Sequence, residues 1–193
     1  MFRTLTKTQF LTLALQKNYI AIYKELIADT FTPISAFESR VKKDDTAMLL
    51  DSGLKFKESG SYSFIGTNPY ATLHTKNGIT TITTAKQQTT ATQPPLTLLR
   101  EFHQNFSCIS DEHGKLAGHM MGFLAYDAIR YFEEIPDRHV DDATIPDILF
   151  HFYRTNLIFN HETNKILVAI VAEVITDSAT VYDQACIEID AII

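Results

Sequence analysis

The sequence has few cysteines, no long apolar segment and no cluster of basic residues, and each absence excludes a class of protein. The two cysteines, Cys108 and Cys186, show no metal-ligand spacing, so we expect ordinary reduced thiols. The longest apolar run, Ile166 to Ala172, is far too short to cross a bilayer, and the N-terminus lacks the apolar stretch of a secretory signal. We therefore expect a soluble, cytoplasmic protein with no membrane partner.

The charge balance argues against nucleic acid as a partner. Lys and Arg number 17 against 23 Asp and Glu, which gives a formal net charge of -6. The basic residues are scattered, whereas a nucleic-acid surface needs clustered Lys and Arg to displace counterions. The 7 His form no His-x3-His or Glu-x-x-His pattern, so the sequence predicts no metal site.

The remaining composition is that of an ordinary globular domain. Hydrophobic residues make up 45% of the 193 positions, enough to bury a core, and we expect one domain over residues 1–193. Hairpins alternate with helices along the chain, and no internal repeat is present. This pattern predicts an α+β fold, with largely antiparallel β-sheets packed with several short helices.

The first third of the chain predicts two helices and three strands. Thr6 is placed to cap a helix over 7–16, and Thr32 followed by Pro33 is typical of the start of another helix. Apolar positions expected on the inner face of that second helix are Ile34, Phe37 and Val41. The predicted strands are a half-buried one at 19–27, a buried one at 48–50 and an alternating one at 62–65.

The middle of the chain contains the strongest hairpin signal. Asn77-Gly78 tolerates positive φ at both central turn positions and separates two alternating runs, 70–76 and 79–84. Residues 67–69 are predicted to form a turn and 85–93 an exposed, mobile loop. A helix then begins at Pro94-Pro95, with Leu99, Phe102 and Phe106 on one face.

The last third predicts a long hairpin between helices. A buried strand is expected over 118–126, with glycines where something packs against the backbone. A short helix ended by Pro136 follows it. The runs 148–159 and 165–174 form a hairpin whose second strand is apolar on both faces and therefore central in a sheet. A final helix covers 177–193.

The residues alone indicate no catalytic centre. No nucleophile with an activating base, no phosphate loop and no paired carboxylates can be located. Asp127, Arg130, Glu133 and Glu134 could position an anionic substrate. Their helical spacing is more simply explained by a surface ion pair between Arg130 and one of the two glutamates. We therefore predict no catalytic residue in this chain.

The pair Asp51-Ser52, at the end of a predicted strand, has two interpretations. An acid and a hydroxyl can hold an ammonium group, while Leu49 and Leu50 supply an apolar wall. Alternatively, Asp51 or Ser52 bonds backbone N–H groups in a turn before Gly53, as Asp-Ser-Gly sequences often do. The residues alone favour the turn.

Several further segments follow one another in a distinctive order. They are Tyr23-Lys24-Glu25, Asp29 to Phe37, Leu49 to Ser52, Tyr62 to Gly66 with Pro69, Gly122 to Glu133, Pro146-Asp147 and Phe159-Asn160-His161. Taken together, they resemble the N-terminal region of anthranilate synthase component I. The resemblance covers almost the whole chain.

The resemblance implies a role in an enzyme of two domains. That family makes anthranilate and pyruvate from chorismate and ammonia derived from glutamine by a partner amidotransferase subunit. Its Mg2+-dependent chemistry belongs to a C-terminal catalytic domain. The sequence stops at Ile193, where the resemblance places the linker to that domain. We therefore expect a regulatory fragment, one half of a larger enzyme, with no cofactor of its own and no activity when isolated.

The resemblance also implies a binding site for L-tryptophan, the feedback inhibitor. Carried over residue by residue, the site includes Leu50, Asp51 and Ser52, with Tyr62 on the following strand as a further candidate. The family's usual glutamate is replaced here by Asp51, whose side chain is one methylene shorter. A ligand's ammonium group would then lie further away or be reached through a water molecule.

Two other functions stay open. Component I of aminodeoxychorismate synthase has the same domain plan and makes a folate precursor, although the segment from Asp29 to Pro33 is more like the anthranilate enzyme. The other is a stand-alone amino-acid-binding regulatory module without a catalytic half.

Overall fold

The structure, a computed structural model, describes residues 4–41, 46–51, 62–136, 144–175 and 177–193. Its helices are α1 (Lys7–Ala14), α2 (Pro33–Val41), α3 (Pro95–Phe106) and α4 (Ser178–Ile192), with a 3-10 helix, η1 (Tyr126–Tyr131). Its strands are β1 (Tyr19–Ile27), β2 (Met48–Asp51), β3 (Tyr62–Lys76), β4 (Ile79–Thr84), β5 (Gln88–Ala91), β6 (Met120–Leu124), β7 (Ile148–Asn160) and β8 (Lys165–Glu173).

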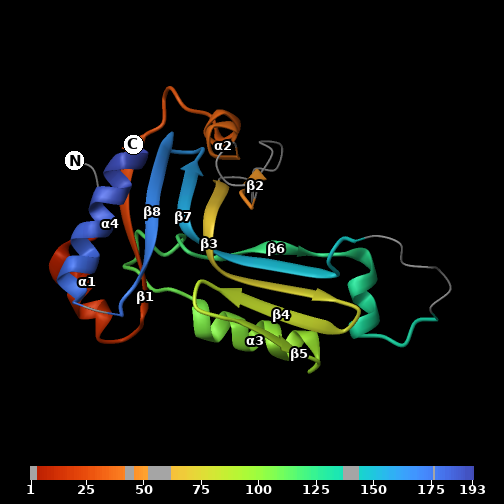
Figure 1. Cartoon of the computed structure of the whole chain (residues 1–193). Helices are drawn as coiled ribbons and strands as arrows, with labels where there is room; N and C mark the ends of the chain where they lie inside the picture. Colours follow the sequence, from red (N-terminus) through yellow and green to blue (C-terminus); the bar gives the residue numbers. More distant parts are fainter. Residues whose placement is uncertain (1–3, 42–45, 52–61, 137–143, 176) are drawn as a thin grey trace. The chain divides into compact units, whose positions relative to one another are not determined.

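The strands pair in an antiparallel sheet. Their order is β1-β8-β7-β3-β4-β5, and β2 also pairs with β3 and β6 with β7. The pairs β1–β8, β7–β8, β2–β3, β3–β4, β4–β5 and β6–β7 are all antiparallel. Together with the helices, this sheet makes an α+β fold, which confirms the predicted class (Figure 1).

The larger of two compact units consists of Met1–Pro69, Ser107–His119 and Tyr153–Ile193. In it β8 lies between β1 and β7, and residues 168–172 of β8 are buried without a break. Helix α4 packs on β8 and β1, and α1 packs on α4 and β1 (Figure 1). The prediction that the second strand of the long hairpin is central is therefore confirmed.

Two predicted helix starts are confirmed by capping bonds. The Thr6 hydroxyl accepts from the N–H of Gln9 at 3.3 Å, and the Gln9 side chain accepts from the N–H of Thr6 at 3.0 Å. The Thr32 hydroxyl accepts from the N–H of Ser35 at 3.1 Å, and α2 begins at Pro33. Such bonds satisfy backbone donors that a helix leaves unpaired, and a capping side chain contributes about 1 kcal/mol.

Two segments of the larger unit are more exposed than the sequence predicts. Ile34 of α2 is 58% exposed, and Ala36 and Arg40 are on the side of α2 that lines a cavity. Leu50 of β2 is 44% exposed, because β2 has four residues and, among the described strands, pairs with β3 alone. Apolar spacing identified these segments correctly as helix and strand but not the face that other elements cover. The side chain of Val41 is outside the described part.

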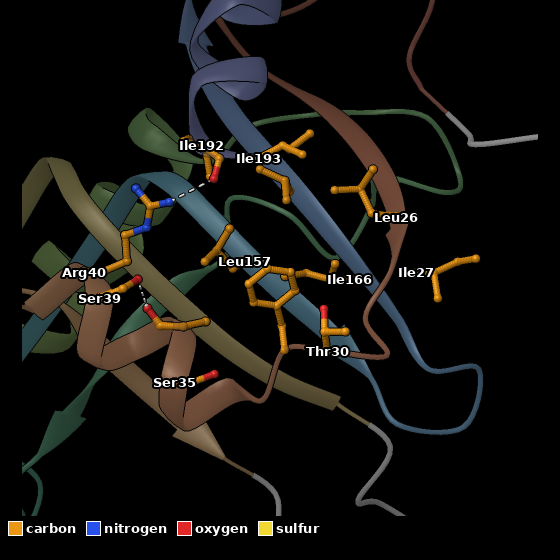
Figure 2. A pocket seen from close by; sticks show the side chains of 13 residues that line it. Leu26, Ile27, Thr30, Ser35, Ser39, Arg40, Leu157, Ile166, Ile192 and Ile193 are labelled. Carbon is orange, nitrogen blue, oxygen red and sulfur yellow. Dashed lines mark hydrogen bonds between the residues drawn. The ribbon is translucent and has the colours of Figure 1, made fainter.

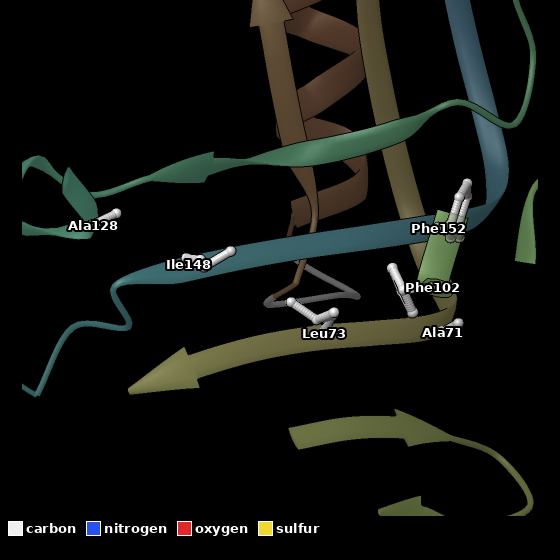
Figure 3. Packing of buried hydrophobic residues seen from close by; sticks show 6 residues of the cluster. All are labelled: Ala71, Leu73, Phe102, Ala128, Ile148 and Phe152. Carbon is white, nitrogen blue, oxygen red and sulfur yellow. The ribbon is translucent and has the colours of Figure 1, made fainter. Parts of the chain in front are cut away.

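The smaller unit consists of Tyr70–Phe106 and Met120–Phe152 and has its own core. Six residues from β3, α3, η1 and β7 form this core: Ala71, Leu73, Phe102, Ala128, Ile148 and Phe152 (Figure 3). The rings of Phe102 and Phe152 lie 5.2 Å apart, within the range of favourable aromatic pairs. The predicted apolar face of α3 is confirmed at Phe102, which is fully buried.

Hairpin and loop predictions have mixed outcomes. Asn77 and Gly78 both have positive φ, which confirms the tight β3–β4 turn. The turn predicted at 67–69 is wrong, because β3 continues through these residues. Within the strand Asn68 adopts a left-handed backbone conformation, with a φ of 56°. The loop predicted at 85–93 contains β5, which pairs with β4. Strand β6 is shorter than predicted and exposed at Phe123 and Leu124.

Both cysteines are free thiols, as predicted, and Cys108 is expected to be chemically inert. Burial raises the pKa of the Cys108 thiol to about 11. Only the thiolate is nucleophilic, so native Cys108 should react with iodoacetamide at pH 8 roughly a hundredfold more slowly than after unfolding in urea. Alkylation followed by mass spectrometry measures both rates. Equal rates in the native and the unfolded protein would contradict this prediction.

Candidate ligand site on strands β2 and β3

The register of β2 and β3 divides the predicted tryptophan contacts between two faces. Asp51 is paired with Ser63 and Leu50 with Phe64. Because side chains alternate along a strand, Asp51 and Ser63 share one face, whereas Leu50, Phe64 and Tyr62 share the other. The structure therefore does not bring Tyr62 and Asp51 to the same face. Ser52 and Gly53 lie outside the described residues.

Asp51 stands at the end of a chain of two hydrogen bonds, from Ser63 to Asp51 and between Ser63 and His161. Its Oδ1 accepts a hydrogen bond from the Ser63 hydroxyl, and Ser63 Oγ lies 2.6 Å from Nε2 of His161, in the turn between β7 and β8. Ser63 is 0% exposed, whereas Asp51 is exposed at the end of β2. The Asp51 carboxylate is thus held on one side, while its remaining lone pairs can accept bonds from a ligand.

The three residues are not arranged as a catalytic triad. In a triad the histidine lies between the serine and the acid and takes the serine's proton. Here Ser63 lies in the middle, and its hydroxyl is directed to a carboxylate. Ser63 is also fully buried and cannot reach a substrate. The arrangement suits the orientation of Asp51 rather than nucleophilic attack.

Tyr62 lies in a separate, charged hollow of about 230 Å³. Its hydroxyl accepts a bond from Asn160 Nδ2 at 3.3 Å. The same hollow is lined by Glu25, which pairs with Lys165 at 2.7 Å. Because these two charges are opposite and paired, the pair offers a ligand no net charge. Tyr62 therefore has surroundings different from those of Asp51.

An apolar cavity of about 380 Å³ lies beside α2 and the ends of β1 and α4, within the larger unit (Figure 2). Its walls include Phe31, Leu157 and Ile166, and neither Asp51 nor Tyr62 lines it. Among the described residues that line it, Arg40 alone has a charged side chain. The Arg40 Nη2 donates to the carbonyl of Ile192 at 3.1 Å, and Nε is enclosed without an acceptor among the described residues.

Arg130 has a different partner from the one predicted. It pairs with Asp127 at 3.3 Å, within η1, and its Nη1 donates to the carbonyls of Ile135 and Pro136. The interpretation as a local surface interaction is supported, although Glu133 and Glu134 are not the partners found. Because Asp127 is 60% exposed, the pair contributes little to stability.

Comparison with known protein families identifies the chain. The family model described as chorismate binding enzyme matches residues 45–191. The chain belongs to the chorismate binding enzyme family. The resemblance found in the sequence is thereby confirmed at the level of the family, and the Asp51 site lies within the matched residues.

Several curated proteins are similar to this family member. Anthranilate synthase component 1 of Aquifex aeolicus is 31% identical over 155 residues, which cover 79% of this chain and 31% of the relative. Anthranilate synthase component 1 of Thermus thermophilus is 28% identical over 74% of this chain and 30% of its own length. Aminodeoxychorismate synthase component 1 of Bacillus subtilis is 30% identical over 69% of this chain and 28% of its own length. The chain thus spans about a third of these relatives.

A solved structure supports the fold of this chorismate binding enzyme family member. Anthranilate synthase component I of Streptococcus pneumoniae matches with a TM-score of 0.53 and 23% identity, covering 86% of this chain and 36% of the other. At that identity the likeness concerns the fold. Among the described residues no group of three His, Cys, Asp or Glu side chains forms a metal site, and no helix is long and apolar enough to span a membrane.

Sequence reasoning missed two residues of the site, Ser63 and His161. Ser63 stands on the inner side of an alternating strand, where a polar residue signals a buried hydrogen bond. His161 lies 98 positions further on in the sequence, so only the folded structure reveals their contact. The acid itself, Asp51, is a prediction that the family resemblance supplies.

Proposed function

We propose that this chain is the N-terminal regulatory part of anthranilate synthase component I and forms one wall of a tryptophan-binding site. The observation that carries the proposal is the exposed Asp51 carboxylate, oriented by Ser63 within a segment that resembles the family's tryptophan motif. A fixed carboxylate with free lone pairs is suited to an ammonium group. Membership of the family and two similar anthranilate synthase components support the enzyme assignment.

The proposed activity belongs to the longer protein. It converts chorismate and glutamine-derived ammonia to anthranilate and pyruvate, in a C-terminal catalytic domain that uses Mg2+. Residues 1–193 carry no catalytic residue in this proposal and are inactive alone. Their partners are that catalytic domain, a glutamine amidotransferase subunit and L-tryptophan, and the enzyme is cytoplasmic.

In the proposed site Asp51 receives the ammonium group of tryptophan, beside Ser52 and the backbone of Leu50. Tyr62 has a smaller part, because it faces away from Asp51. Tryptophan inhibits by binding more tightly to a domain arrangement that binds chorismate poorly. It can shift the equilibrium only by its difference in affinity between the two arrangements.

The complete gene product, supplied with chorismate, Mg2+ and ammonium, is expected to release fluorescent anthranilate and to be inhibited by tryptophan. Asp51→Asn removes the charge with little change in size. We expect it to raise the inhibitory tryptophan concentration about tenfold, the scale of one hydrogen bond to a charged group. Asp183→Asn, on an exposed Asp that pairs with Lys7, is the matched control. Unchanged inhibition in Asp51→Asn would contradict the assignment of this site.

A second candidate function is component I of aminodeoxychorismate synthase, favoured by the Bacillus subtilis relative. Asp51 in place of the usual glutamate weakens the distinction between the two enzymes. The same assay distinguishes the two enzymes by their product. An aminodeoxychorismate synthase would accumulate aminodeoxychorismate in place of anthranilate. A stand-alone binding module is the remaining alternative. An in-frame catalytic domain after residue 193 would exclude it.

A further inference from the structure

The hydrogen bonds around Ser63 have a direction that chemistry fixes. A carboxylate has no proton to donate, so the Ser63 hydroxyl must donate to Asp51 Oδ1. Its single proton is then used, and Ser63 can only accept from Nε2 of His161. Nε2 must therefore carry a proton, as it does in the Nε2–H tautomer and in the imidazolium ion. The chain of donors runs from His161 through Ser63 to Asp51.

These two hydrogen bonds restrict the rotation of the Ser63 hydroxyl and of the Asp51 side chain. Ser63 is fully buried on β3 and cannot exchange its bond to Asp51 for one to solvent. Because the Nε2–H of His161 donates to Ser63 Oγ, the Ser63 hydroxyl cannot turn to donate to His161 instead of Asp51. The exposed Asp51 side chain would otherwise sample several rotamers, and ordering it would oppose ligand binding.

We propose that Ser63 is a positioning residue, oriented by His161, which fixes the Asp51 carboxylate for the ammonium group of an amino-acid ligand. The proposal rests on the function proposed above and assigns roles to two residues outside the predicted motif. Ser63 itself does not touch the ligand. It occupies Oδ1 and holds Asp51 in one orientation, which offsets part of the disadvantage of a side chain one methylene shorter than glutamate.

The experiment measures the preference for a ligand with an ammonium group over one without it, rather than the affinity for a single ligand. Isothermal titration calorimetry on the complete gene product compares L-tryptophan with indole-3-propionate, which has the same ring and carboxylate but no ammonium group. We expect Ser63→Ala to lower the preference for tryptophan about tenfold, while binding of indole-3-propionate stays nearly constant. A general loss of structure would lower the affinity for both ligands together.

Matched variants separate positioning from packing. Ser63→Thr keeps the hydroxyl and is expected to restore the preference. His161→Gln keeps an N–H donor near Nε2 and should be milder than His161→Leu. Ser110→Ala removes a hydroxyl that donates to the Ala21 carbonyl at 2.9 Å and should leave the preference unchanged. In the double variant, Ser63→Ala should add nothing to the loss already caused by Asp51→Asn.

Two failures are distinguishable. If Asp51→Asn abolishes the preference and Ser63→Ala leaves it intact, or if Ser63→Ala weakens both ligands equally, the positioning role is wrong and the tryptophan site stands. If Asp51→Asn leaves the preference intact, or tryptophan does not bind, the proposed site itself fails and the positioning role fails with it.

Discussion

Replacing Asp147 with alanine is expected to lower the free energy of unfolding by about 3 kcal/mol. This carboxylate is nearly buried and accepts from the Tyr131 hydroxyl at 2.6 Å, the Asn77 N–H at 3.0 Å and Lys76 Nζ at 3.3 Å. Burial and the bond to Asp147 raise the pKa of Tyr131, so this donor stays protonated through neutral pH. Removing the acceptor takes away the carboxylate to which the Tyr131 hydroxyl and the Asn77 N–H donate.

Urea unfolding followed by circular dichroism measures this loss. Asp183→Ala is the matched control, because Asp183 pairs with Lys7 at 2.7 Å but is 60% exposed, and we expect it to cost less than about 1 kcal/mol. Asp147→Asn keeps one acceptor oxygen and should fall between the two. If Asp147→Ala costs no more than Asp183→Ala, the network does not stabilise the β3–β4 turn.

Local chemistry explains which parts of the fold the sequence predicts. Thr6, Thr32 and Asn77-Gly78 act through bonds or dihedral angles within a few residues, so their effect is visible without tertiary structure. The β8 strand was recognised as central because an uninterrupted apolar run needs cover on both faces.

Features that depend on distant segments were predicted less well. Strand β5 has only Gln, Thr and Ala residues, and it forms because β4 offers an edge with which to pair. Asn68-Pro69 predicts a turn because Asn-Pro sequences favour turns, whereas β3 runs through both residues with Asn68 at positive φ. For β5 the partner strand, and not the local sequence, decides the structure.

The candidate site divides in the same way. Asp51 is predicted as a ligand contact through the family resemblance, because the residues alone favour a turn at Asp51-Ser52. That Tyr62 faces away could not be predicted, because it depends on the register of β2 against β3. The contact of Ser63 with His161 depends on how β3 and the β7–β8 turn come together.

Gly122 is the second position where one substitution is expected to be severely destabilising. It lies in β6 opposite Phe150 of β7, and a Cβ there would stand 1.9 Å from the carbonyl oxygen of Leu149 and 2.7 Å from Cα of Phe150. This confirms the prediction that something packs against a glycine in this segment. Both obstructing atoms belong to the backbone of the paired strand, which can move only by disturbing the pairing. Gly122→Ala should therefore cost about 3 kcal/mol, the upper end of overpacking effects.

Gly78→Ala separates this effect from the general cost of replacing a glycine. Gly78 has a φ of 75°, and a Cβ there would meet nothing within 4 Å, so the substitution strains the turn without a clash. We expect it to cost about 1 kcal/mol, as for other residues forced into the left-handed region. Chemical denaturation of the two variants compares them directly. Equal losses would mean that β6 adjusts to the added methyl group, and that the close approach of β7 does not require glycine at position 122.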